Sequence, residues 1–437
     1  MIRYLLLLVT SVALFSPSFA QDLKSQIDEQ AQALEEQVVA WRRDIHQYPE
    51  LSNREFRTAE KVAEHLKSLD IEITTKVAHT GVVGVLKGGQ PGPVVALRAD
   101  MDALPVTERV DIPYASKEIG EYNGEEVGVM HACGHDTHVA ILMGAVQVLS
   151  DMRADLKGTV KFIFQPAEEG APNGEEGGAE LMVREGVLTS PNVDVIFGLH
   201  INSKTEVNTI GYRPEGTMAG VDRLEIKIKG AQTHGAYPWA GVDPIVTASQ
   251  IVLGLQTIVS RNLEIIKAPA VVTIGKIDGG VRSNIIPEEV SMIGTIRSLD
   301  PEMQDKIHRR IREIATNIGE SAGAEVEVII NKGYPVTYND PKLTAQMVGT
   351  LQEVAGEDNV FLRYPVTGAE DFSFFAQEVP GFFFFLGGMP AGMNPEEAAP
   401  HHTPDFFIDD SGLTLGVRAL SRLTVDYMDQ YEPEMGK

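Results

Sequence analysis

The single cysteine of the chain stands two residues before a histidine, and this pair could begin a metal site. Cys133 and His135 lie in the segment 130–136, which contains a glycine. Thiolate and imidazole are the side chains that bind borderline-soft divalent metals best. Apolar residues at helical spacing follow His135, so Cys133 should precede a helix whose N-terminus favours the thiolate. A buried structural cysteine beside a helix-capping histidine would fit this segment equally well.

Further metal-competent side chains follow two predicted buried strands. The apolar run 160–164 leads to Glu168 and Glu169, and the run 193–197 leads to His200. Short apolar runs bounded by glycine and proline are typical of strands buried on both faces. Because functional groups collect at the carboxyl ends of parallel strands, these side chains should meet at one edge of the sheet.

These segments supply more ligands than a single catalytic zinc requires, since such an ion takes about three protein ligands and a water. Two ions about 3.5–4 Å apart, sharing a hydroxide that attacks a carbonyl, fit the set better. The reaction would also need a proton carrier that is not a ligand, and Glu168 beside Glu169 suits this role. In isolation, the two glutamates would instead indicate a solvated acidic loop. The candidate ligands are Cys133, His135, Glu169, His200 and one of His401 and His402.

The order of predicted elements indicates an α/β fold with an inserted α+β unit. Buried strands and a helix at 135–152 imply an α/β layer with a mainly parallel sheet. From residue 217 the hydrophobic pattern changes: apolar and charged residues alternate, as in a sheet with one solvated face. The elements of this region follow the order β-α-β-β-α-β of a ferredoxin-like unit. We expect a signal peptide at 1–20, a first domain in two parts at 21–216 and 334–437, and an inserted domain at 217–333.

Composition excludes several classes of protein. The 437 residues are 43% apolar and carry a net charge of -25, with charges of both signs spread along the chain. That apolar content excludes a disordered protein, and the length allows a large core. An acidic surface repels nucleic acid and anionic membrane, so neither is an expected partner.

The N-terminal residues have the pattern of a secretory signal peptide. Arg3 is followed by the apolar run 5–15 and the small-residue motif Ser-Phe-Ala at 18–20. A membrane anchor is the weaker alternative, because about 18 apolar residues are needed to span a bilayer and Pro17 ends this run. We expect cleavage after Ala20 and a soluble, exported protein, periplasmic rather than secreted. One cysteine cannot form an intrachain disulfide, which leaves metal ligation as a reason to keep it.

Taken together, the motifs carry a resemblance. They are Cys-Gly-His-Asp, Gln-Pro-Ala-Glu-Glu, Gly-Leu-His and a late His-Thr-Pro, together with Arg-Arg-Asp-Ile-His at 42–46 and Pro-Glu-Leu at 49–51. As a set, and in this order, they resemble the metal-dependent aminoacylase and carboxypeptidase type of amidohydrolases. This family includes hippurate hydrolase, N-acyl-amino-acid deacylases and plant indole-acetyl-amino-acid hydrolases. The resemblance covers nearly the whole mature chain.

The resemblance implies a ligand set and a base. It assigns two divalent metal ions, zinc or manganese with cobalt also compatible, and makes Glu168 the general base and then the general acid. His402 is preferred to His401 because it directly precedes Thr-Pro. In wider relatives a histidine stands at the position of Asp100, so Asp100 and Asp102 could either support the ligands or be structural. The implied ligands are Cys133, His135, Glu169, His200 and His402.

The inserted domain resembles the lid of that family, which mediates dimerisation. His234, in Gln-Thr-His-Gly-Ala, matches a histidine that stabilises the tetrahedral oxyanion, often in the partner subunit's site. Asn284 and Arg297 match positions that bind the substrate's carbonyl or carboxylate. Without the resemblance, His234 would be an ordinary loop histidine and Arg297 a surface strand residue.

The leading hypothesis is an exported two-metal amidohydrolase. It would cleave N-acyl or N-aroyl amino acids, as in hippurate, by direct attack of metal-bound hydroxide, and would form a homodimer or higher homo-oligomer through the lid. A dipeptidase or metallo-exopeptidase is the alternative in the same class. A non-catalytic metal-binding or peptide-binding protein on the same scaffold is disfavoured, because pure binding needs no proton shuttle beside the ligand glutamate. Five further histidines are interpreted as structural or exposed: His46, His79, His131, His138 and His308.

Overall fold

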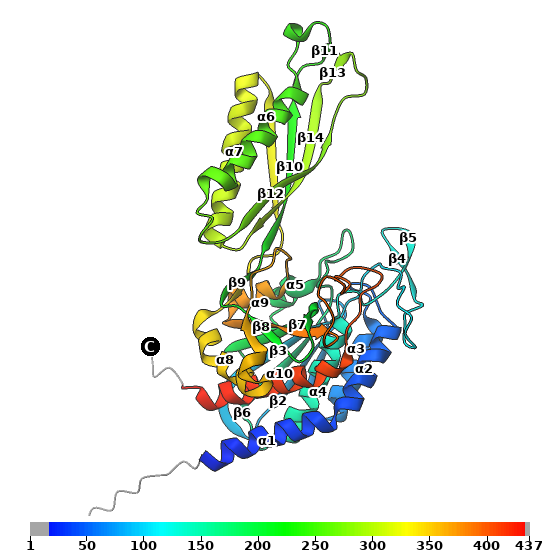
Figure 1. The fold of residues 1–437 in the computed structure, drawn as a ribbon, viewed down its shortest axis with the longest axis vertical. Coiled ribbons are helices and arrows are strands. Elements are labelled where there is room, and N and C mark those ends of the chain that lie inside the picture. The colour runs from blue at the N-terminus through cyan, green and yellow to red at the C-terminus, as the bar shows by residue number, and fades with distance from the viewer. Residues whose placement is uncertain (1–16, 433–437) are drawn as a thin grey trace, which may run out of the picture.

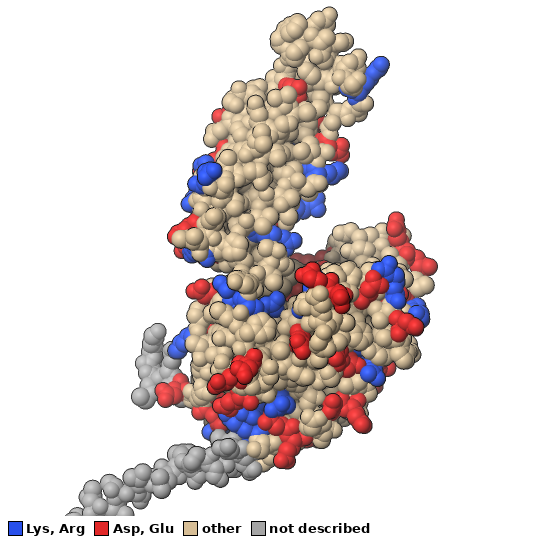
Figure 2. All heavy atoms as spheres, viewed as in Figure 1, with Lys and Arg blue, Asp and Glu red and all other residues tan. Residues whose placement is uncertain are grey.

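The structure, a computed structural model, describes residues 17–432 and consists of two bodies joined by a narrow neck (Figure 1). The apolar run of the predicted signal peptide lies outside the described residues, so export and cleavage after Ala20 stay predictions. Among the described helices, none combines the length and apolar character needed to cross a bilayer. Acidic and basic side chains are interspersed over the visible face of the larger body (Figure 2).

The larger body is built around an eight-stranded sheet with strand order β1-β2-β6-β3-β7-β18-β8-β17. Its central neighbours β6, β3, β7 and β18 pair in parallel, whereas β1, β2 and β8 add antiparallel pairs toward the edges. The mainly parallel sheet expected from the sequence is therefore confirmed. The strands are β1 Glu72–Val77, β2 Gly81–Lys87, β3 Gln90–Asp100, β6 Lys157–Gln165, β7 Val195–Glu206, β8 Ile210–Tyr212, β17 Val360–Leu362 and β18 Gly381–Met389.

Helices cover both faces of this sheet and enclose two cores. The residues of strand β18 are apolar without interruption because both faces of the strand are buried: Phe382 and Phe384 enter one core, and Phe383 and Phe385 enter the other. Helices α4 and α10 pack together over the first core, and α5 and α9 lie on the second. The helices of this body are α1 Pro17–Ala33, α2 Glu35–Gln47, α3 Phe56–Ser68, α4 His135–Asp151, α5 Gly178–Arg184, α8 Pro341–Ala355, α9 Phe372–Glu378 and α10 Leu413–Gln430, with the short 3-10 turns η3 Glu357–Asn359 and η4 Asp410–Gly412.

The smaller body is a four-stranded antiparallel sheet with order β12-β14-β10-β15 and two helices on one face. Leu224, Ile226 and Ile228 alternate inward along β10 and pack beneath α6 and α7, as the period of two predicts. The chain order β-α-β-β-α-β confirms the ferredoxin-like unit, and all its elements lie within the predicted insertion 217–333. They are β10 Gly220–Lys229, α6 Pro244–Thr257, the π-turn η2 Ile258–Asn262, β12 Ala270–Asp278, β14 Glu289–Ser298, α7 Pro301–Ala322 and β15 Glu325–Lys332.

The described residues also form three small two-stranded sheets. One lies at the far tip of the smaller body, one joins the segments of the neck, and one forms a hairpin that projects from the larger body (Figure 1). They pair β11 Thr233–His234 with β13 Ile285–Ile286, β9 Glu215–Met218 with β16 Thr337–Asn339, and β4 Ile119–Tyr122 with β5 Glu125–Gly128, and the 3-10 turn η1 Pro238–Ala240 follows β11.

A buried arginine ties together the segments at the carboxyl edge of the large sheet. Arg98 of β3 donates hydrogen bonds to Gln165 and Asp100, both at 2.7 Å, and its guanidinium lies 2.9 Å from the carboxylates of Glu370 and Asp371. Burial lowers the pKa of Arg98, but the three carboxylates outweigh this and hold it above its usual range. One side chain therefore links β3, the end of β6 and the segment before α9.

Replacing Arg98 with methionine should strongly destabilise the fold, because it leaves three buried carboxylates without their cation. We expect the free energy of unfolding to fall by about 3–5 kcal/mol, measured by urea unfolding in the presence of a chelator. Arg109→Met is the matched control, since its ion pair with Asp405 is exposed and screened by solvent and should contribute little to stability. Equal urea midpoints for the two variants would contradict this account.

Candidate metal centre

The five predicted ligands converge at the carboxyl edge of the large sheet. The sulfur of Cys133 lies 3.4 Å from Nε2 of His200 and 3.3 Å from Nε2 of His402, which is itself 3.0 Å from a carboxylate oxygen of Glu169. The ligand atoms of Cys133, Glu169 and His402 lie within 4.8 Å of one another, as do those of His135, Glu168 and Glu169. Glu169 therefore links two groups of ligand atoms, the arrangement that a pair of ions would need.

Local backbone geometry places the first two ligands. Gly134 separates them with a φ of 99°, and a Cβ at this position would meet the side chain of Ile201 at 2.3 Å. His135 is the first residue of α4, as the sequence predicts. Cys133 is buried just before that helix, so both side chains project from its N-terminal end.

His200 lies inside its strand and not after it, which corrects the predicted strand 193–197. Strand β7 continues to Glu206 because β18 runs parallel beside it, and His200 pairs there with Phe385. The neighbouring strand β3 pairs with β7 only as far as Gly198. His200 therefore extends past the end of β3 and faces the site even though it belongs to a regular strand.

Two histidines are held in the tautomer that a metal requires. Nδ1 of His135 donates to the carbonyl of Asp102 at 2.8 Å, and Nδ1 of His200 donates to the carbonyl of Ile201 at 2.5 Å. The opposite nitrogen of each ring is left to face the site, and Nε2 of His135 is buried without a hydrogen-bond partner in the described part of the chain. A backbone carbonyl behind each ring is the usual support of a histidine that ligates a metal. The residues present therefore fit a divalent cation.

Neighbouring histidines at 401 and 402 have different surroundings. His401 donates from Nδ1 to the carbonyl of Cys133 and accepts the backbone N–H of Ser203 on Nε2, both at 3.1 Å. Both of its nitrogens are thus engaged by the backbone. His402 instead turns Nε2 toward Cys133 and Glu169, and its φ of 63° helps to direct it there. This difference supports the choice of His402 as the ligand.

Asp102 organises the backbone that carries both glutamates. Its two carboxylate oxygens accept the N–H groups of Glu168 and Glu169, each at 3.0 Å, and the Ser52 hydroxyl donates to it at 2.7 Å. Ala167, with a φ of 54°, lets the chain turn sharply before this pair. Asp102 therefore supports the backbone of the segment that carries Glu168 and the predicted ligand Glu169.

Asp100 supports a different histidine. It accepts a hydrogen bond of 2.6 Å from Nδ1 of His138, whose Nε2 accepts the N–H of Ile201 at 2.8 Å. His138 is therefore fully engaged, in line with a structural role. Asp100 also lies 3.8 Å from Nε2 of His135, so its negative charge faces the site.

The other histidines without an assigned role lie in varied surroundings. His46 is buried between Asp136 and Glu108, and His308 pairs with an aspartate of β10. His79 is exposed, whereas His131 is buried and makes no hydrogen bond within the described residues.

Negative charge dominates the site. Burial raises the pKa of the Cys133 thiol well above its usual range, and Glu169, Glu168 and Asp100 raise it further. The expected lowering of this pKa by the helix N-terminus is wrong for the isolated protein, because desolvation and three carboxylates outweigh a partial helix charge. Burial lowers the pKa of His135, but Asp100 and Asp102 raise it to about 10. Divalent cations would balance these acidic groups and stabilise the thiolate.

A cleft of about 500 Å³ opens above the ligands and receives residues from both bodies. Glu168 lines it at 5% exposure, and burial together with Glu370 raises the pKa of Glu168 well above its usual range. Arg297, at the end of β14, reaches the same cleft, as the resemblance implies. His234 and Asn284 do not line it, since they lie with β11 and β13 at the far tip of the smaller body (Figure 1).

Three residues of the cleft were missed by reasoning from the sequence. Tyr334 donates its hydroxyl to the carbonyl of Glu168 at 2.7 Å. The guanidinium carbon of Arg363 lies 3.6 Å from the ring centroid of Phe385, a cation-π contact. Glu370 adds a carboxylate near Glu168. Only Glu370 carried a local signal, an acidic pair after glycine in an irregular segment.

Substitution at 401 and 402 tests which histidine is a ligand. His402→Ala should lower the metal affinity by about 10–100-fold or more, because it removes a direct donor. His401→Gln should keep its metal and lose stability instead, because His401 bonds the backbone on both sides. Metal content by mass spectrometry after dialysis, together with thermal unfolding, distinguishes the two. Retention of both ions by His402→Ala would refute the assignment.

Comparison with known proteins agrees with this geometry. The model of peptidase family M20/M25/M40 matches residues 96–426. The chain is 38% identical to thermostable carboxypeptidase 1 of Saccharolobus solfataricus over 94% of this chain and all of that one. It is 38% identical to N-acetylcysteine deacetylase of Bacillus subtilis over 90% and 97% of the two chains. Among solved structures, the Bacillus subtilis YXEP protein, described as a dinuclear metal-binding peptidase, has a TM-score of 0.77 at 34% identity over 92% of this chain and all of that one. The chain therefore belongs to peptidase family M20/M25/M40 and is a metal-dependent amidohydrolase or peptidase.

Proposed function

We propose that this enzyme hydrolyses the amide bond of N-acyl or N-aroyl amino acids and releases a carboxylic acid and a free amino acid. The observation that carries the proposal is the position of Glu168. It is a buried carboxyl group that lies beside the ligand cluster and lines the same cleft as two arginines. The ligand cluster could bind metal ions, and Glu168, which is not one of the proposed ligands, could transfer a proton. The two arginines could bind a carboxylate of the substrate.

The proposed ligands are Cys133, His135, Glu169, His200 and His402, and they would hold two divalent ions such as zinc, manganese or cobalt. Such ions polarise an amide carbonyl and lower the pKa of a water. A solved relative is described as dinuclear, which supports two ions over one. The mixture of thiolate, imidazole and carboxylate donors is compatible with each of these metals.

Glu168 is the proposed carrier of the proton. Its backbone N–H is fixed by Asp102 and its carbonyl by Tyr334, so its side chain is directed into the cleft. Its carboxylate would take a proton from the attacking water and return it to the leaving nitrogen. The buried surroundings that raise its pKa favour the protonated form that this second step needs.

Arg297 and Arg363 are the proposed partners of the substrate carboxylate. Neither makes an ion pair with a carboxylate in the described part of the chain, although both line the cleft. An arginine fork binds a carboxylate through two parallel hydrogen bonds. A free amino-acid carboxylate is shared by N-acyl amino acids and peptides, and a relative is named a carboxypeptidase, so peptide hydrolysis is the second candidate. Hydrolysis of hippurate and acetyl-amino acids, compared with dipeptides, separates the two.

Replacement of Glu168 by glutamine removes the proton carrier and leaves the ligands intact. Turnover of an N-acyl amino acid should fall by about 10²–10⁴-fold, while both metal ions stay bound. Glu169→Gln is the matched control next to it, because it should lose metal as well as activity. The proposal fails if Glu168→Gln turns over substrate at the rate of the unmodified enzyme.

We further propose that His234 and Asn284 act in the site of a second copy, within a homodimer formed through the smaller body. Support comes from their position at the far tip and from the exposed His234 ring. His234→Ala should lose about 10²–10³-fold in turnover if its ring stabilises the oxyanion.

A mixing experiment tests whether His234 acts between subunits. Exchange of subunits between His234→Ala and Glu168→Gln should create one intact site in each mixed dimer and restore activity. If His234 serves its own chain, both sites stay defective and the mixture stays inactive. Each variant exchanged with itself is the control.

A further inference from the structure

We propose that a second cavity, which shares Glu169 with the arginine-lined cleft, receives the acyl group of the substrate. We call it the acyl chamber and define it by Leu51, Ala103, Leu104, Pro105 and Tyr122. The inference rests on the proposed function and deepens it, because it names the part of the protein that selects the acid released.

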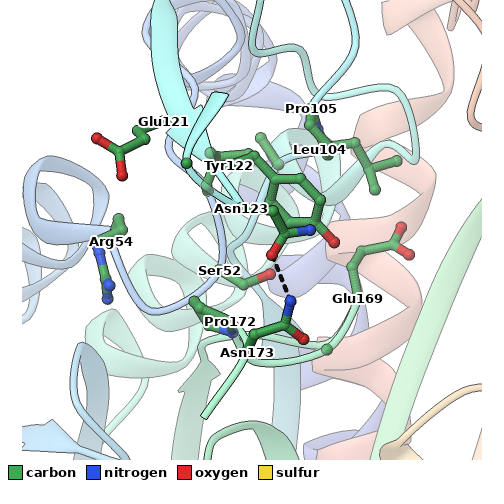
Figure 3. A pocket seen from close by; sticks show the side chains of 14 residues that line it. Ser52, Arg54, Leu104, Pro105, Glu121, Tyr122, Asn123, Glu169, Pro172 and Asn173 are labelled. Atoms are coloured by element: carbon green, nitrogen blue, oxygen red, sulfur yellow. Dashed lines mark hydrogen bonds between the residues drawn. The ribbon is translucent and has the colours of Figure 1, made fainter. Parts of the chain in front are cut away.

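The chamber has a volume of about 410 Å³, within the usual range for small-molecule sites. Figure 3 shows Tyr122 and Leu104 on one side of the hollow, and Pro172 and Asn173 on the other. Leu51 and Ala103 are buried beneath it, whereas Tyr122 is 44% exposed. The chamber therefore offers an apolar floor and one aromatic side chain near its opening.

The chamber adjoins one of the proposed metal ligands, Glu169. Glu169 lines both the chamber and the arginine-lined cleft. Ser52, in the chamber wall, donates a hydrogen bond to Asp102, which holds the backbone of Glu168 and Glu169. An amide bond held at Glu169 would thus have one end in each cavity.

Charge decides which end of the substrate enters which cavity. The only arginine of the chamber, Arg54, is already paired with Glu175 at 2.6 Å, and Glu121 adds negative charge at the rim. The cleft instead contributes Arg297 and Arg363, neither of which forms an ion pair with a carboxylate among the described residues. Glu168, Glu169 and Glu370 also line the cleft, but its two arginines give a substrate carboxylate hydrogen-bond donors that the chamber lacks, which leaves the chamber for the acyl end.

The apolar floor indicates the kind of acyl group. An acetyl group would leave most of the floor in contact with water, whereas an aromatic or branched group would cover it. Tyr122 can also pack against an aromatic ring. We therefore assign the chamber to bulky acyl groups such as benzoyl.

Two separate segments close the chamber. The β4–β5 hairpin turns at Asn123 and Gly124, whose φ values of 55° and 83° match the Asn-Gly type I′ turn of a tight hairpin. Asn173, in the loop after Glu169, donates from its side-chain amide to Asn123 at 2.7 Å (Figure 3). This hydrogen bond joins the hairpin tip to the loop. The chamber wall is therefore formed by two segments that lie outside the large sheet.

The test compares three substrates in variants of the metal-loaded enzyme. The substrates are benzoylglycine, acetylglycine and benzoylglycinamide, which lacks the carboxylate. Leu104→Trp fills the chamber and should lower the ratio of kcat/KM for benzoylglycine over acetylglycine by about tenfold or more, since pocket contacts of this size discriminate by about 10–200-fold. Benzoate binding, measured by calorimetry, should weaken in the same variant. Arg363→Met should instead lower the preference for benzoylglycine over benzoylglycinamide and leave the acyl ratio unchanged.

Glu126→Ala on the same hairpin is the control, since this exposed residue does not line the chamber. If Leu104→Trp does not fold, Tyr122→Ala replaces it at a partly exposed position and should also lower the acyl ratio. An unchanged acyl ratio in the folded variant overturns the chamber assignment. Failure of the unmodified enzyme to hydrolyse either acylglycine overturns the proposed function itself, so the two failures are distinguishable.

Discussion

The main physical constraint on this structure is the cost of burying several acidic side chains at the carboxyl edge of the large sheet. Asp100, Glu370 and Asp371 share the guanidinium of Arg98, whose positive charge neutralises part of this buried negative charge. Beyond it, Glu168 and the thiol next to His135 remain buried with raised pKa values. Buried charges persist only when they are paired or bind metal, so divalent cations bound at the candidate ligands would balance the charge that Arg98 leaves uncompensated.

Backbone groups hold this cluster as firmly as side chains do. Asp102 receives two consecutive N–H groups, while carbonyls fix the rings of His135 and His200. These supports come from β3, the end of β6 and β7, three strands that lie next to one another. A substitution behind the ligands should therefore disturb metal binding nearly as much as one among them.

The two cavities proposed for the two ends of the substrate both lie at this edge of the sheet. Glu169 lies where the arginine-lined cleft and the acyl chamber meet, so chemistry is fixed by the sheet while selectivity is left to its surroundings. Arg297 arrives from the smaller body, and the chamber is closed by the β4–β5 hairpin and the loop at Asn173. Such peripheral segments can vary without disturbing the candidate metal ligands, which would let one fold accept different acyl groups.

Periodicity and motif order predicted the central strands of the large sheet, the order of elements in the smaller body, the alternation in β10 and the candidate ligands, because these are local properties of the chain. The sequence favoured His402 over His401 only from the adjacent Thr-Pro, and the contacts that support this choice, the backbone groups that bond each ring, are not visible in the sequence. It missed Arg363 and Tyr334, which carry no local signal, and it misjudged the direction of the Cys133 pKa shift. These contacts and shifts appear only in the folded chain, because burial and through-space charge depend on segments that are distant in the sequence.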